Sequence, residues 1–84
     1  MSVDGWPFNR RAIAAKDAGR HQEELAILLE GVRRKVDTPY TYERAALLLE
    51  RARQLQQALQ VCDVWLALPE QVRHQGAATG RKIM

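Results

Sequence analysis

The sequence has little of what disulfide-stabilised, metal-binding or membrane-spanning proteins need. Its one cysteine, Cys62, cannot form an internal disulfide, and no group of Cys and His residues has metal-ligand spacing. The first residues show no basic segment followed by an apolar run, so no signal peptide is visible. No segment approaches the roughly 20 apolar residues that a membrane span needs. We therefore expect a cytoplasmic protein that does not enter a membrane and binds no metal or cofactor.

Strand-forming residues are also scarce. Aromatics make up 6% of the chain, and Val, Ile and Thr are few, whereas Ala, Leu, Gln, Glu and Arg dominate. This composition favours helices over strands by intrinsic propensity. Apolar residues (46%) and charged residues (27%) occur in ordinary proportions for a folded protein. Because 84 residues suffice for one domain at most, we expect a single all-α domain over residues 1–84.

Residues suited to catalysis are few. Catalysis needs a nucleophile with a base, a pair of carboxylates in a pocket, a metal cluster or a phosphate-binding loop. His21 falls in an expected turn and His74 near the C-terminus, neither near a plausible partner, and the five glycines are scattered. Cys62 lies in an apolar stretch and is expected to be a small core residue. No catalytic residue is predicted, and we do not expect an enzyme.

The charge is only mildly positive. Thirteen Lys and Arg face ten Asp and Glu, a net charge of +3, and the arginines are interleaved with glutamates. This pattern is typical of solvated helix surfaces, whereas a nucleic-acid binder usually concentrates positive charge on one face. Association with nucleic acid stays open as an alternative. It would use the following basic residues: Arg10, Arg11, Arg33, Arg34, Lys35, Arg81 and Lys82.

The spacing of apolar residues predicts four helices. Leu25, Leu28 and Val32, for example, recur at three- and four-residue steps, as on one face of a helix. Gly19 ends the first helix, and Asp37 or Thr38 can cap the third. The first three expected helices span about residues 7–18, 22–35 and 40–53. The fourth begins at residue 54 or 55 and ends at 68, before Pro69.

The chain also repeats itself at a spacing of 34 residues. A shift of 34 aligns the two predicted helix pairs and their turns. Similar residues coincide as well, for instance Trp6 with Tyr40 and Ile13 with Leu47. Identical residues coincide at these pairs: Arg10 and Arg44, Ala12 and Ala46, Ala18 and Ala52, Gln22 and Gln56, and Leu25 and Leu59.

Two helices in 34 residues is the period of the tetratricopeptide repeat. Residues 39–72 resemble that family at seven positions: Tyr42, Ala45, Ala46, Leu49, Ala58, Cys62 and Pro69. Residues 5–38 resemble it more distantly, at Phe8, Ala12, Gly19, Leu25, Leu28 and Gly31. Arg11, Glu24 and Trp65 depart from the family pattern; Trp65 stands where its counterpart is Gly31.

The resemblance implies two antiparallel helix hairpins stacked as a short α-solenoid, with residues 73–84 as a flexible basic tail or short cap. In this family, the first helices of successive repeats line a groove for peptides or extended segments. The matching positions in this sequence are Trp6, Asn9, Ile13, Lys16, Asp17, Tyr40, Glu43, Leu47, Glu50 and Arg51. Alternatively, Trp6 and Tyr40 merely cover the helix ends.

Two repeats are fewer than the three or so that a solenoid usually needs to stand alone. We therefore expect apolar surface on the fourth helix, at Val61, Trp65 and Leu68, and self-association or docking through it. The sequence favours a small helical adaptor, regulator or inhibitor subunit. It would bind a larger protein or associate with a second copy of itself as a homodimer. A role restricted to oligomerisation is a further alternative.

Overall fold

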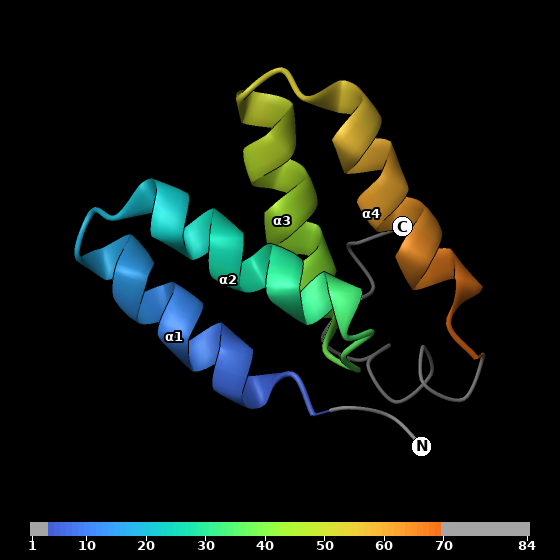
Figure 1. Cartoon of the computed structure of the whole chain (residues 1–84), viewed down its shortest axis with the longest axis horizontal. Coiled ribbons are helices and arrows are strands. Elements are labelled where there is room, and N and C mark those ends of the chain that lie inside the picture. Colours follow the sequence, from blue (N-terminus) through green and yellow to red (C-terminus); the bar gives the residue numbers. More distant parts are fainter. Residues whose placement is uncertain (1–3, 70–84) are drawn as a thin grey trace.

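The computed structural model describes residues 4–69, which form four helices and no strand (Figure 1). The all-α prediction is confirmed, and each helix ends within two residues of its expected position. The predicted tail or cap at residues 73–84 lies outside the described residues. The helices are α1 (Trp6–Asp17), α2 (His21–Arg33), α3 (Pro39–Arg51) and α4 (Leu55–Ala67).

Consecutive helices pair as two hairpins, α1 with α2 and α3 with α4. The hairpins are joined through α2, which packs against α3. In Figure 1 they fan out from the short linker between α2 and α3, with α1 and α4 on the two outer sides. The antiparallel pairing expected from the sequence is confirmed, and α2 and α3 form its centre.

The 34-residue spacing extends to the backbone of the two hairpin turns. Gly19 and Arg53 are equivalent, and both have left-handed backbones, with φ of 77° and 61°. Each turn closes with the same three N–H···O=C bonds, a pattern that satisfies the last carbonyls of a helix. In the first turn, the N–H groups of Ala18, Gly19 and Arg20 donate to the carbonyls of Ala14, Lys16 and Ala15, respectively. In the second turn, the N–H groups of Ala52, Arg53 and Gln54 donate to the carbonyls of Leu48, Glu50 and Leu49, respectively.

The core combines small residues, which let the helices approach, with a few large ones. Gly31 is buried at the contact between hairpins, where an added Cβ would lie 3.0 Å from the Cγ2 atom of Thr41. At the equivalent position, Trp65 packs on Tyr42, with ring centroids 5.2 Å apart. Phe8 lies beside Gly31 in the first hairpin, as Tyr42 lies beside Trp65 in the second. The same position is thus occupied by a small residue in the first hairpin and by a large one in the second.

A chain of polar contacts ties the start of α1 to the linker and α3. The Thr41 hydroxyl donates to Asn9 Oδ1 at 2.6 Å and lies 2.9 Å from the Thr38 hydroxyl. Thr38 occupies the N-cap position of α3, but its side chain caps no backbone N–H, and the carboxylate of Asp37 accepts the Gly5 N–H instead. The side-chain cap expected at Thr38 is therefore wrong, because its hydroxyl lies against that of Thr41 instead.

The buried Tyr42 hydroxyl holds the linker itself. It donates to the Val36 carbonyl at 2.8 Å. Burial raises the pKa of Tyr42 to about 12, so the phenol keeps its proton, and its hydrogen bond, across the physiological range. The linker carbonyl is thereby satisfied inside the core.

The prediction of which residues form an exposed apolar edge on the fourth helix is wrong. Val61, Trp65 and Leu68 are buried in the hydrophobic core. Since α4 is apolar on nearly all sides, periodicity alone did not identify its inner face. The large apolar residues of α4 that are exposed are Leu55, Leu59 and Leu66.

The turns generate a test of stability. Arg53 pays the steric penalty of a left-handed backbone, which glycine does not. We expect Arg53→Gly to raise the free energy of unfolding by about 1 kcal/mol and Gly19→Ala to lower it by about the same amount. Urea unfolding followed by far-UV circular dichroism measures both, and changes of the same sign in the two variants would contradict the equivalence of the turns.

Candidate partner-binding surface

A buried ion pair lies at the centre of the contact between the hairpins. The side chain of Glu24, on α2, has no exposed surface, and that of Arg44, on α3, is 14% exposed. Arg44 Nε donates to Glu24 Oε2 at 2.6 Å, and Nη2 reaches Oε1 at 3.4 Å. This hydrogen bond raises the pKa of the Arg44 guanidinium. A buried carboxylate without such a partner is costly, so the pair fixes α3 against α2.

Tyr40 lies one turn before Arg44 on α3 and is half-buried. Burial raises the pKa of the Tyr40 hydroxyl, the Arg44 charge lowers it, and the carboxylates of Glu24, Asp17 and Glu43 raise it again. A carboxylate from each of α1, α2 and α3 thus acts on this hydroxyl, and two of the three, Asp17 and Glu43, are predicted binding residues.

The other predicted binding residues are exposed or half-buried, with one exception. Trp6 and Leu47 are exposed apolar side chains, and Ile13 is half-buried. The remaining exposed members are charged: Lys16, Glu50 and Arg51. Asn9 is the exception, because it is buried and accepts the hydrogen bond from Thr41. Its assignment as a binding residue is wrong, since α1 turns this side chain toward α3.

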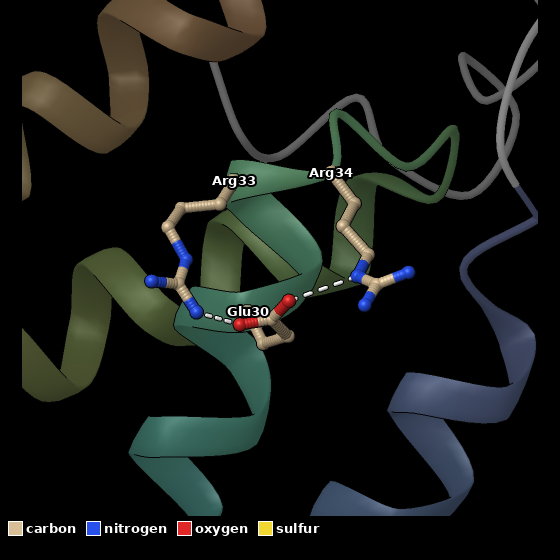
Figure 2. A network of polar contacts seen from close by, with 3 residues as sticks. All are labelled: Glu30, Arg33 and Arg34. Carbon is tan, nitrogen blue, oxygen red and sulfur yellow. Dashed lines mark hydrogen bonds and ion pairs between the residues drawn. The ribbon is translucent and has the colours of Figure 1, made fainter.

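Several of the basic residues have partners within the chain. Figure 2 shows Arg33 and Arg34, at the end of α2, on either side of the Glu30 carboxylate, which forms an ion pair with both. The guanidinium of Arg34 also lies 5.8 Å from the centroid of the Phe8 ring, and that of Arg11 lies 5.1 Å from it. The Glu30 carboxylate offsets part of the positive charge of Arg33 and Arg34, and the Phe8 ring contacts both Arg11 and Arg34.

An apolar hollow that the sequence did not reveal lies between α2 and α4. Its volume is about 480 Å³, and Leu29, Val32, Val61 and Val64 form its apolar wall. The rim is polar, with Arg33, Lys35, Gln57 and Gln60. A smaller hollow of about 320 Å³ continues past Lys35 and Val64 toward Pro69. The lining suits apolar side chains and offers no set of converging catalytic groups.

Residues 4–69 contain no group of three or more His, Cys, Asp or Glu side chains placed to hold a metal ion. Cys62 is half-buried on α4 and forms no disulfide, and His21 is exposed at the start of α2. None of the helices described reaches the length and apolarity required to cross a membrane. No family model, curated protein or solved structure matches the chain.

The buried pair generates a second stability test. Arg44→Leu leaves the Glu24 carboxylate buried and unpaired, and we expect it to lower the free energy of unfolding by about 3 kcal/mol or more. Glu24→Ala should cost less, because the Arg44 side chain reaches the surface. The double variant Glu24→Ala/Arg44→Leu should be more stable than Arg44→Leu alone.

Urea unfolding of the four proteins forms a double-mutant cycle. Arg51→Leu, at an exposed position of the same helix, is the control and should change the free energy of unfolding by at most about 0.5 kcal/mol. Losses in the two single variants that simply add up in the double variant would show that the pair does not couple the hairpins.

Proposed function

We propose that the chain is a non-enzymatic protein-interaction module, a small helical adaptor or regulator that binds an extended segment of a larger protein across α1 and α3. The observation that carries the proposal is the arrangement around the Glu24–Arg44 pair. There, Arg44, which is paired with Glu24 of α2, lies on α3 with Tyr40 and Glu43, and the same helix exposes Leu47. The 34-residue period and the resemblance to tetratricopeptide repeats support the choice of this surface.

The chemistry of the surface indicates the kind of segment it accepts. Among the predicted binding residues, the carboxylates of Asp17, Glu43 and Glu50 outnumber the cations of Lys16 and Arg51. A segment with Lys or Arg next to an apolar residue complements this combination. The charges favour the correct partner over others, and an apolar contact at Leu47 supplies affinity.

A cytoplasmic location is part of the same proposal. A chain with a single cysteine gains nothing from the oxidising environment in which disulfides form and persist.

The alternative is association with nucleic acid through Arg10, Arg11, Arg33, Arg34 and Lys35, with Arg81 and Lys82 outside the described residues. Against it stand the ion pairs of Glu30 with Arg33 and Arg34. The two functions respond differently to salt, because binding to phosphates weakens steeply as salt concentration rises. A labelled DNA duplex and a labelled peptide, titrated at low and high salt, separate them.

A displayed library of unstructured peptides, selected on the full chain, tests the proposed surface. We expect selected peptides to combine Lys or Arg with an apolar residue. Leu47→Glu and Glu43→Lys should each weaken their binding by about tenfold or more, the loss of a central contact. Leu59→Glu, an exposed leucine on α4, is the matched control and should leave the affinity unchanged. Peptides that bind the Leu47→Glu variant as tightly as the unmodified chain would exclude this surface.

A further inference from the structure

The hollow between α2 and α4 is an apolar surface that the proposed function does not use. Both helices pack on α3 and have little contact with each other, so a space of about 480 Å³ remains between them. Of its apolar lining residues, Val32 and Val61 are buried, and Leu29 and Val64 are half-buried. None of the ten binding residues predicted from the sequence lines it. The hollow is therefore a second surface, separate from that of α1 and α3.

The charged residues at the rim of this hollow are both basic. Arg33 and Lys35 stand there with two neutral glutamines, and no acidic residue of the described chain is among them. Figure 2 shows Arg33 on the side of Glu30 nearer α4 and Arg34 on the side of α1. One Glu30 carboxylate thus serves two guanidiniums, and within residues 4–69 no carboxylate forms an ion pair with Lys35. The rim therefore keeps a net positive charge.

Lys35 stands where the larger hollow continues into the smaller one. It lines both hollows together with Val64, and the smaller hollow extends the apolar surface as far as Pro69. The Lys35 N–H donates to the Val32 carbonyl at 3.0 Å, which fixes its backbone at the end of α2. Asp63 lines only the smaller hollow, so the positive charge is concentrated at the larger one. A fixed cation thus lies between two apolar surfaces.

We propose that these two hollows bind an acidic peptide segment that carries apolar side chains on both sides of a carboxylate. One apolar side chain fills the larger hollow, and the next contacts the smaller one. The carboxylate between them lies beside Lys35, with Arg33 on the same rim. Removal of apolar surface from water supplies the affinity, and the charge of the rim selects acidic segments over basic ones.

Charge and apolarity together argue against other occupants of the hollows. Residues 70–84 follow Pro69 in the chain, but they contain three basic residues and one acidic residue. A segment of that charge is repelled by Lys35 and Arg33. The phosphates of a DNA duplex carry the complementary charge, but they bring no apolar group to cover the valines and leucine of the wall. An acidic segment with apolar side chains complements both features.

The proposal goes beyond the function proposed for α1 and α3, because it uses other helices and a partner of opposite charge. The predicted binding residues of α1 and α3 favour a basic segment, whereas the rim between α2 and α4 favours an acidic one. A chain with both surfaces can hold two different segments at the same time. The second surface would thus allow the chain to link two proteins, as an adaptor does.

A labelled peptide in which leucine and aspartate alternate over six residues tests the proposal. Fluorescence anisotropy at physiological salt measures its binding to the full chain, and we expect saturable binding. Replacement of the leucines by alanine should weaken binding by about tenfold or more, and replacement of the aspartates by asparagine by about fivefold.

Two results with these peptides overturn the proposal. One is the absence of binding to the full chain, which is the outcome when residues 70–84 or a second copy already fill the hollows. The other is equal binding of the alanine peptide, or displacement of the leucine peptide by a DNA duplex of the same charge. Either observation would show that charge alone attracts the peptide and that the apolar wall takes no part.

Variants of the rim locate the bound peptide. Lys35→Gly removes the ammonium and suits the left-handed backbone at this position, where φ is 56°, so the fold is retained. Gln60→Glu places a carboxylate on the rim. We expect each variant to weaken binding by about fivefold while the helical circular dichroism is unchanged. Gln56→Glu, exposed on the same helix but outside the hollow, is the matched control and should bind like the unmodified chain. Unchanged affinity in both rim variants overturns the proposal.

The two binding surfaces can fail independently of each other. Leu47→Glu and Glu43→Lys, which should weaken binding of basic peptides at α1 and α3, should leave the affinity for the leucine–aspartate peptide unchanged. Lys35→Gly should in turn leave the affinity for the basic peptides unchanged. A loss of acidic-peptide binding in Leu47→Glu would place the acidic peptide on α3 and overturn its assignment to the hollows.

Discussion

The fold depends on one buried ion pair. A carboxylate with no exposed surface is stable only with a partner, and the partner of Glu24 comes from the other hairpin, in Arg44. A contact made of small apolar residues can slide, because apolar packing has no strong directional preference. The hydrogen bonds from Arg44 are directional, and they fix the position of α3 on α2. The place of α4 follows, since α4 is held by α3 through residues such as Trp65 and Tyr42.

The sequence predicted the helices and turns well because local interactions determine them. Three- and four-residue steps of apolar residues define the helices, and a left-handed residue at position 19 is what glycine favours. The 34-residue shift predicted the second turn as well, although Arg53 there has no such preference. That result came from the equivalence of the two halves and not from the residue itself.

The sequence predicted the candidate surfaces less well, because they depend on which side of each helix faces inward. In α4 nearly every side is apolar, so a linear pattern does not distinguish Val61 and Trp65, which are buried, from Leu59 and Leu66, which are exposed. Burial of Glu24 was missed for a related reason. Acidic residues near the start of a helix have a sufficient explanation in the helix dipole. The sequence did contain one signal for the burial of Glu24. The equivalent residue in the second half is the small Ala58, so a charged residue stands in the first half where the second half has a small one.

The two halves differ at the positions through which the first half receives the second. The backbone pattern is shared, but Glu24 becomes Ala58, which removes the acceptor that a following Arg44-like residue would need. Gly31 permits the close approach of Thr41, whereas Trp65 fills the equivalent space from within its own hairpin. The first half is therefore built to receive another hairpin, whereas the second half lacks both of these features.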